Sequence, residues 1–378
     1  MKAWVLTMFN TPYELQEIPV PTIQDPHDIL VQVDAASYCH TDAVLAAGSM
    51  HPPSLPHIGC HEFTGTVVAV HAHAHAHSPS NQSQSQSTPV HDVHIGDRVA
   101  VPGRGYHVCG KCMECRNPSG PEPDDPGFSV YCPYAGGGLG VGRPGGFQEY
   151  ALVDARQAAL IPSGMTAVEV APLMCAGLTI YAALRKCRLQ PGQRVGIIGC
   201  GGGLGHLGLQ FATKMGLRTT GVDVSPQALK LARELDTGAT IVDASLQKPE
   251  DVRRNMGEED GRDHIAEMGL DAALILPESQ KSFDYGVELV RNGGLVQVIS
   301  FPPDGFHASA NDLVFRRVRV EGSLIGSNRA MRDMFDFCVK HGVRAKIRTY
   351  PFEKLNELVE DYHSGVGGKL VLDMSRKD

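Results

Sequence analysis

Four cysteines stand close together in this sequence of 378 residues and have the spacing of metal ligands. They are Cys109, Cys112, Cys115 and Cys132. The first three are separated by two residues each in CGKCMEC, so three thiolates can face one ion. Tetrahedral Zn²⁺ takes four ligands, and a site closed by four thiolates has a structural role. We therefore predict a structural zinc site. Asp124 or Asp125 could replace Cys132 as the fourth ligand, and buried apolar cysteines are the alternative without a metal.

Three further candidates lie far apart along the chain: Cys39 in YCHTD, His61 in GCHEFTG and Cys175 in LMCAGLT. Two thiolates and one neutral imidazole balance the charge of Zn²⁺ and leave a fourth position for water or a substrate oxygen, which is the ligand set of a catalytic site. Taken singly, each of these residues is more typical of a protein core. Only the combination predicts a second, open zinc site.

The elements that must hold these residues change character along the chain. Residues 1–160 contain short alternating runs such as ILVQVDAAS and FTGTVVAV, which predict a twisted, barrel-like β domain. From about residue 194, apolar runs alternate with helical stretches, as is typical of βαβ units on a parallel, doubly wound sheet of the Rossmann type. The tail could extend that sheet or return to the first domain. We expect an α/β protein with domains at 1–160 and 161–305 and a C-terminal segment, 306–378, that does both.

A glycine-rich stretch, VGIIGCGGGLGHLG, lies between a predicted strand and a predicted helix. Glycines allow a tight turn and let backbone N–H groups approach a pyrophosphate at the helix N-terminus. The stretch is one residue longer than a strict G-x-G-x-x-G, so the roles of its members stay open. The candidate cofactor-binding residues are Gly199, Gly201, Gly202, Gly203, Leu204 and Gly205.

Asp223 ends the next predicted strand, LRTTGVD. A carboxylate there would bind the adenosine ribose hydroxyls and repel a 2′-phosphate, which favours NAD over NADP. Asp223 could instead cap the helix that begins at Pro226.

The composition indicates a globular protein with a small partner. Hydrophobic residues make up 42% of the chain, charged residues 20%, and the net charge is -8, which gives nucleic-acid binding no support. No apolar run has the length of a membrane span, and MKAWVLTMFN lacks the apolar region of a signal peptide. Ten cysteines in such a chain are more typical of metal ligands or buried thiols than of disulfides. We expect a cytoplasmic protein that binds neither nucleic acid nor membrane.

Two polar insertions interrupt the first domain, at about 71–92 and 117–131. The stretch HAHAHAHSPSNQSQSQSTPVHDVH, residues 71–94, holds six of the 17 histidines. Its Ser, Gln and Pro residues cannot bury enough apolar area to fold, so we expect a surface loop. Alternating His and Ala could capture a divalent ion, but a solvated insertion is the simpler interpretation.

Six segments resemble, in their order along the chain, the zinc-containing medium-chain alcohol dehydrogenases. They are CHTD, GCHEFTG, CGKCMEC with CP, GGFQEYALV, APLMCAGLTIYAAL and GCGGGLGHLGLQFA. The resemblance covers the chain apart from the two insertions and is closest to the yeast-like fungal branch. It implies a GroES-like catalytic domain beside an NAD-binding Rossmann domain. It also implies one catalytic and one structural Zn²⁺ per chain, NAD(H) as cofactor, and a homo-oligomer, either a dimer or a tetramer.

The same resemblance implies roles around the metal. Cys39, His61 and Cys175 would bind the catalytic zinc. Glu62 would lie beside it and exchange as a ligand, and Asp42 would orient the site from behind.

Further roles concern the alcohol and the cofactor. Thr41 would take the alcohol proton, His40 would lie near the cofactor pyrophosphate, and Thr179 near the nicotinamide. Lys369 would contact the pyrophosphate where many relatives carry arginine, without the bidentate geometry of a guanidinium.

Two departures from the family pattern concern the proton and the substrate. Many relatives complete the proton relay with a histidine where this chain has Val44, so the proton must leave through the cofactor ribose to water or another group. Near Met50 and residues 104–106, yeast-type ethanol enzymes carry tryptophans, whereas the single tryptophan here is Trp4. Candidate pocket-wall residues are Met50, Tyr106 and Met174, although a core residue is the simpler interpretation of each. We expect a larger primary alcohol, or its aldehyde in reverse, for example in fungal secondary metabolism.

Two other functions fit parts of the pattern. A zinc-free quinone or enone reductase could use the same scaffold, but it would lack the seven metal ligands. A non-catalytic sensor of zinc and nucleotide is an alternative from a different class.

Overall fold

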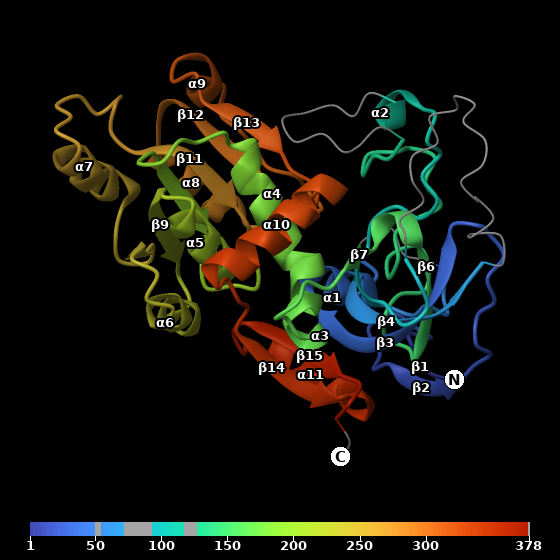
Figure 1. Ribbon diagram of the computed structural model, residues 1–378. Helices are drawn as coiled ribbons and strands as arrows, with labels where there is room; N and C mark the ends of the chain where they lie inside the picture. Colours follow the sequence, from blue (N-terminus) through green and yellow to red (C-terminus); the bar gives the residue numbers. More distant parts are fainter. Residues whose placement is uncertain (50–53, 72–92, 117–126, 377–378) are drawn as a thin grey trace.

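Two lobes, each built on its own β-sheet, make up the computed structural model, which describes residues 1–49, 54–71, 93–116 and 127–376 (Figure 1). Both chain termini lie on the first lobe. Residues 72–92 of the histidine-rich stretch, Met50, Asp124 and Asp125 fall outside the described residues.

The first lobe contains a largely antiparallel sheet in the order β14-β15-β3-β4-β5-β7, with β6 also paired to β3. Its strands are β3 (Asp28–Tyr38), β4 (Glu62–Val70), β5 (Arg98–Pro102), β6 (Tyr150–Asp154), β7 (Ala159–Leu160), β14 (Ile347–Pro351) and β15 (Lys369–Asp373). A separate hairpin joins β1 (Lys2–Val5) to β2 (Glu14–Glu17). Val31 and Val33 are buried while Gln32 between them is exposed, which is the alternation that predicted the strand. This lobe is the expected β domain.

The second lobe contains a wholly parallel sheet in the order β10-β9-β8-β11-β12-β13. Its strands are β8 (Arg194–Ile198), β9 (Arg218–Asp223), β10 (Thr240–Asp243), β11 (Leu270–Ile275), β12 (Val290–Val298) and β13 (Arg319–Gly322). Numbered within the sheet, this order is 3-2-1-4-5-6, so the predicted Rossmann-type sheet is confirmed. The strand order reverses between β8 and β11, where such folds bind ligands.

Helices cover both faces of the parallel sheet and join the two lobes (Figure 1). The helices are α1 (His40–Ala46), α2 (Met113–Arg116), α3 (Ala167–Val170), α4 (Ala176–Lys186), α5 (Gly205–Lys214), α6 (Pro226–Glu234), α7 (Pro249–Glu259), α8 (Gln280–Leu289), α9 (Ala310–Val314), α10 (Asn328–His341) and α11 (Leu355–His363). The 3₁₀ turns are η1 (Ala155–Gln157), η2 (Ala171–Met174) and η3 (Phe352–Lys354). Ser225, not Asp223, caps α6 by accepting the N–H of Ala228, so the capping alternative for Asp223 is wrong.

The C-terminal residues belong to both lobes. β13 extends the parallel sheet beside β12, and the chain then returns through α10 to the first lobe, where β15 pairs with both β14 and β3. The indole N–H of Trp4 donates to the carbonyl of Phe352 at 2.8 Å and ties this segment to the N-terminal hairpin. In Figure 1 the segment lies beside β3.

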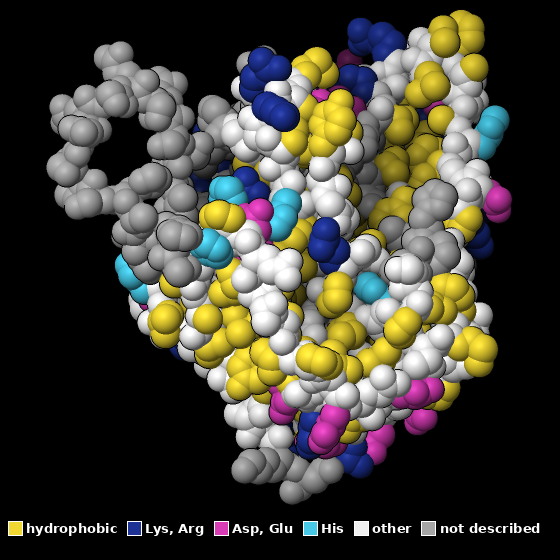
Figure 2. All heavy atoms as spheres, turned by 90° about the vertical axis from the view of Figure 1, so that its right-hand side faces the viewer, with side chains coloured by type: hydrophobic (Ala, Val, Ile, Leu, Met, Phe, Trp, Pro, Cys, Tyr) yellow, Lys and Arg dark blue, Asp and Glu magenta, His cyan; other side chains and the backbone are white. Residues whose placement is uncertain are grey.

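The surface of the first lobe carries basic, acidic and apolar side chains interspersed, with several histidines gathered on one part of it (Figure 2). Within the described ranges, no single helix is long and apolar enough to span a membrane. Only the pair Ala167–Met174 and Ala176–Lys186, bent by 51°, meets the requirement when its halves are joined.

Candidate active site

Four side chains from distant parts of the sequence converge between the lobes. Cys39, His61, Glu62 and Cys175 offer ligand atoms that all lie within 4.8 Å of one another. Cys39 precedes α1, His61 and Glu62 stand at the start of β4, and Cys175 separates η2 from α4. The Sγ atoms of Cys39 and Cys175, 136 residues apart, are 3.9 Å from each other. The structure therefore brings together the three predicted catalytic ligands.

Asp42 is 1% exposed and forms hydrogen bonds that position residues of this cluster. Its Oδ2 accepts the backbone N–H of Cys39 and its Oδ1 that of Cys60, both at 2.9 Å. Its Oδ1 also lies 3.4 Å from Nδ1 of His61. The opposite ring nitrogen, Nε2 of His61, is buried without a hydrogen-bond partner. A buried polar atom without a hydrogen-bond partner destabilises the fold. This geometry leaves Nε2 free to bind a metal.

The donor set fits Zn²⁺ on its own chemistry. Two sulfurs and one imidazole nitrogen are available, and Glu62 is a fourth donor that can be present or absent. The hydrogen bond from Cys175 outweighs the effect of burial and, with the charges of Lys369 and His61, lowers the pKa of Cys39 well below its usual value. The thiolate is the form that binds metal, and the surroundings favour it at Cys39, whereas the same hydrogen bond raises the pKa of Cys175.

Glu62 is contacted by three donors, and burial raises its pKa to about 8 against the opposing charge of Lys369. The ammonium of Lys369 contacts its Oε1, the hydroxyl of Ser37 donates to the same oxygen at 2.6 Å, and the N–H of Ala176 donates to Oε2 at 3.3 Å. Burial lowers the pKa of Lys369, but the charges of Glu62 and Cys39 more than offset this and raise it above its usual value. Lys369 also donates to the carbonyl of Tyr38 at 2.9 Å. Its ammonium therefore points to the metal cluster, and only its stem lies under Gly203 of the glycine-rich turn.

A cavity of about 860 Å³ opens beside the cluster, between the lobes and at the carboxyl ends of β8 and β11. Most of the predicted cofactor and catalytic residues line it, namely His40, Thr41, Thr179, Gly199, Gly202, Gly203, Leu204, Gly205 and Asp223. Gly201 does not line it, and a Cβ there would lie 2.1 Å from the carbonyl oxygen of Ala228 in α6. Gly201 therefore allows α6 to pack against the turn. The other glycines of the turn line the cavity, so the two roles that the sequence left open belong to different residues.

Asp223 lies at the end of β9 and faces the cavity. Its Oδ2 accepts the N–H of Gly201 at 3.1 Å, and its Oδ1 accepts those of Val224 at 2.8 Å and Ser225 at 3.2 Å. These bonds fix the carboxylate beside the turn.

His40 bridges the lobes across the cavity. Its Nδ1 lies 3.0 Å from the hydroxyl of Tyr362 on α11, and its Nε2 lies 3.2 Å from Oε1 of Glu278, which follows β11. Sequence analysis did not select Glu278, since a single glutamate in a loop carries no spacing signal.

The pocket wall differs from the sequence-based candidates. Met174 is fully buried in the core of the second lobe, and Tyr106 turns inward to bond Asp28, so the core interpretation applies to both. The wall instead includes Gly103, Gly105, Val130, Val141, Leu324 and Ile325. Apolar residues in loops have no periodicity, which is why the sequence did not select them.

The four cysteines with two-residue and longer gaps, Cys109, Cys112, Cys115 and Cys132, form the second cluster. Their sulfurs lie within 4.8 Å of one another. The N–H of Cys112 points to the sulfur of Cys109 at 3.3 Å, and the N–H of Cys115 to that of Cys112 at 3.4 Å. Backbone N–H groups of Lys111 and Cys112 lower the pKa of Cys109 to about 6. This set also fits Zn²⁺, with every position taken by protein.

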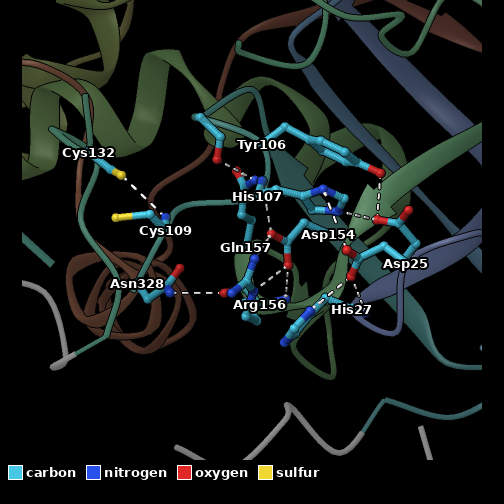
Figure 3. A network of polar contacts seen from close by, with 12 residues as sticks. Asp25, His27, Tyr106, His107, Cys109, Cys132, Asp154, Arg156, Gln157 and Asn328 are labelled. Atoms are coloured by element: carbon cyan, nitrogen blue, oxygen red, sulfur yellow. Dashed lines mark hydrogen bonds and ion pairs between the residues drawn. The ribbon is translucent and has the colours of Figure 1, made fainter. Parts of the chain in front are cut away.

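A polar network, not singled out from the sequence, anchors the loop that leads into this second cluster (Figure 3). The hydroxyl of Tyr106 donates to Oδ1 of Asp28 at 2.5 Å, and Nε2 of His107 lies 2.8 Å from the same oxygen. The N–H of His107 reaches Asp154, which forms an ion pair at 2.6 Å with Arg156. The network joins the cysteine loop to the ends of β3 and β6, because Asp28 and Asp154 face each other in that pairing.

Comparison with known proteins agrees with this architecture. The family described as "Alcohol dehydrogenase GroES-like domain" matches residues 25–163, and "Zinc-binding dehydrogenase" matches residues 203–340. An alcohol dehydrogenase of Geobacillus stearothermophilus is 33% identical over 376 residues, 99% of each chain. Alcohol dehydrogenase 1 of Emericella nidulans is 32% identical and spans 98% of this chain and 97% of its own.

Among solved structures, an acetophenone reductase from Geotrichum candidum in complex with NAD has a TM-score of 0.76 at 26% identity, covering 98% of this chain and 96% of its own. The predicted GroES-like domain is confirmed. A bacterial and a fungal relative are about equally similar, so closeness to the fungal branch stays a prediction.

Proposed function

The chain belongs to the zinc-type medium-chain alcohol dehydrogenase family, and we propose that it oxidises an alcohol, or reduces its aldehyde, with Zn²⁺ and NAD(H). The observation that carries this proposal is the convergence of Cys39, His61 and Cys175 around an unpartnered imidazole nitrogen beside the interlobe cavity. When bound, Zn²⁺ would polarise the substrate oxygen as a Lewis acid and NAD⁺ would accept the hydride.

The residues of the chain then have separate tasks. Cys39, His61 and Cys175 would hold the catalytic metal, with Glu62 as the exchangeable fourth donor and Asp42 fixing the tautomer of His61. The second cluster, Cys109, Cys112, Cys115 and Cys132, would hold a structural metal.

Proton transfer begins at Thr41 in this proposal. Thr41 lines the cavity together with Cys39, and a hydroxyl can accept one hydrogen bond while donating another. Val44 carries no titratable group, so the proton leaves toward solvent without a histidine at that position.

Cofactor binding is assigned to the glycine-rich turn and to Asp223. The turn opens α5, where backbone N–H groups and the helix dipole favour a pyrophosphate. The carboxylate of Asp223 faces the cavity, where it would accept the ribose hydroxyls and disfavour a 2′-phosphate. The NAD bound in the similar Geotrichum candidum enzyme supports this preference. Thr179 is assigned to the nicotinamide end.

The substrate is proposed to be larger than ethanol. Gly103, Gly105 and Gly138 line the cavity with no side chain, and Val130, Val141 and Leu324 supply apolar surface. Apolar contacts with a longer chain would therefore be gained without a steric penalty.

Metal analysis and a steady-state assay on the same preparation test the proposal. We expect about two zinc ions per chain, NADH formation from alcohols, a higher kcat/KM for hexanol or an aromatic alcohol than for ethanol, and a strong preference for NAD⁺ over NADP⁺. Two zinc ions without turnover on a broad alcohol panel would favour a sensor. Absence of zinc with enone-dependent NAD(P)H oxidation would favour a reductase.

A further inference from the structure

One histidine that the proposed function leaves unused lies directly under the glycine-rich turn. His206 is the second residue of α5 and is 0% exposed. A fully buried imidazole at the start of a nucleotide-binding helix must satisfy two ring nitrogens. Both find backbone partners, one in the glycine-rich turn and one in the segment that connects the second lobe to β14.

On one side the ring holds the turn. Nδ1 lies 3.0 Å from the carbonyl oxygen of Gly202, which also accepts the backbone N–H of His206 at 3.1 Å. Gly202 lines the interlobe cavity, and its own N–H donates to the carbonyl of Gly199 at 3.2 Å. The imidazole therefore fixes the peptide between Gly202 and Gly203, two residues that line the cavity.

On the other side the ring holds the crossover segment, residues 342–346, which leads from α10 to β14. The N–H of Lys346 donates to Nε2 of His206 at 3.1 Å. Because Nε2 must accept this bond, the ring proton sits on Nδ1 and is donated to Gly202. The two contacts require a single neutral tautomer.

A second side chain of α5 strengthens the attachment. Gln210 lies one turn further on, on the same face as His206. Its Nε2 donates to the carbonyl of Arg344 at 2.9 Å, and its Oε1 accepts the N–H of Arg344 at 3.2 Å. The helix that opens at the glycine-rich turn therefore binds the crossover segment at two points.

The crossover segment is connected to the metal cluster through Lys369. The carbonyl of Lys346 accepts the backbone N–H of Lys369 at 2.8 Å, and the ammonium of Lys369 contacts Glu62. The stem of Lys369 packs under Gly203, where a Cβ would lie 3.2 Å from its Cδ. A chain of contacts thus runs from Gly202 through His206, Lys346 and Lys369 to Glu62.

We propose that His206 is a positioning residue for the cofactor, which fixes the pyrophosphate-binding turn against the crossover segment and so sets the turn relative to the Lys369–Glu62 pair. This inference rests on the proposed NAD(H) binding. Burial lowers the pKa of His206 to about 4, so the ring keeps the neutral form through the pH range of an ordinary assay.

Three substitutions separate the two contacts of the ring. The amide of Asn reaches the position of Nδ1, and that of Gln reaches the position of Nε2. His206→Asn therefore keeps the bond to Gly202, His206→Gln keeps the bond to Lys346, and His206→Leu keeps neither. Gln210→Met is the matched control, because it loosens the crossover segment without touching the turn.

The measurements are the Kd for NADH by fluorescence titration, the Tm, and the rate at which a chelator removes catalytic zinc with and without NADH. Losing the bond to the turn is expected to raise the Kd about tenfold in His206→Gln and His206→Leu. His206→Asn and Gln210→Met are expected to stay within about threefold of the wild type. NADH should slow zinc removal in the wild type and do so less in His206→Asn, where the connection to Lys369 is lost.

The possible outcomes are distinct. If His206→Leu folds and binds NADH as tightly as the wild type, the positioning role is excluded. If the Kd follows the Tm across all four variants, the histidine is merely structural and the inference is equally overturned. A wild-type chain that binds zinc but no NADH would instead refute the proposed function, and with it the premise of this inference.

Discussion

The two metal-ligand clusters use similar atoms but are assembled in different ways. In the four-cysteine cluster, Cys109 and Cys132 are 23 residues apart, and one short stretch of the chain supplies every ligand. In the cluster beside the cavity, Cys39 and Cys175 are 136 residues apart and come from different elements. A local loop can gather its own ligands, whereas the distant set depends on both lobes being folded.

Their surroundings differ as well. In the four-cysteine cluster, backbone N–H groups point to the sulfur atoms of Cys109 and Cys112. This arrangement is expected of a closed site with a structural role. The cluster beside the cavity has charged supports, Asp42 and Lys369, and one buried imidazole nitrogen without a partner. The difference indicates that one site holds the loop together while the other is kept open for chemistry.

The largest effect should follow loss of a ligand at the open site. Cys175→Ser is expected to lower kcat/KM for alcohol oxidation by more than about 100-fold, because a direct ligand contributes more than its supports. Zinc content should fall by one ion per chain. Cys187→Ser is the matched control, since this buried thiol only donates to the carbonyl of Ala183. Comparable losses in both variants would mean that the activity does not depend on this cluster.

Removing a support of the same site should cost less. Asp42→Asn keeps the shape but weakens the acceptor for His61, Cys39 and Cys60. We expect a loss of about 10- to 100-fold in zinc affinity or turnover, measured by competition with a chelator and by steady-state kinetics. Asp34→Asn, which changes a carboxylate that accepts from Thr66 on the same sheet, should leave both unchanged.

Opening the four-cysteine cluster should affect stability more than chemistry. Cys112→Ser is expected to lower the Tm by about 5 °C or more, because the loop loses its internal metal. One zinc ion should be lost while kcat of the remaining folded enzyme changes only a few-fold. Cys338→Ser, a fully buried thiol outside both clusters, is the control. A loss of kcat as large as that of Cys175→Ser would contradict the division of roles.

The smallest effect concerns proton transfer beside the open site. Val44 lies three residues after Thr41 on α1, on the same face of the helix. A histidine there accepts a proton only in its neutral form, so in Val44→His the rate of alcohol oxidation should gain a rise with pH near about 6.5. The pH dependence of kcat measures this, and Val44→Gln is the control without a titratable group. If the wild type, Val44→His and Val44→Gln have the same pH dependence of kcat, the proposed proton transfer through Thr41 is wrong.

Several parts of the fold and site followed from local patterns. Alternating polar and apolar residues predicted β3, and the buried apolar run RVGII predicted β8. The two-residue gaps in CGKCMEC predicted a cluster that the loop does form. These predictions succeeded because residues close together in the sequence determine which face of a strand is buried and how a short loop folds.

Other parts could not be read locally. Met174 and Tyr106 were considered for the pocket wall, but one packs in the second lobe and the other bonds Asp28. Asp223 faces the cavity while Ser225 caps α6, although aspartate and serine are both favourable N-cap residues. Glu278 reaches His40 only because the lobes face each other. The direction in which a loop side chain points depends on its tertiary neighbours.

By itself, the sequence determined the order and kind of the elements, the local cysteine cluster, and the chemical types available to the distant one. Only the tertiary structure decided that Lys369 lies against Glu62, because β15 pairs with β3 in a register that sets Leu370 opposite Tyr38. It also decided that His206 joins the glycine-rich turn to the crossover segment. Residue spacing specifies contacts within a turn or a strand, whereas contacts between lobes depend on register and packing that are fixed only when the whole chain has folded.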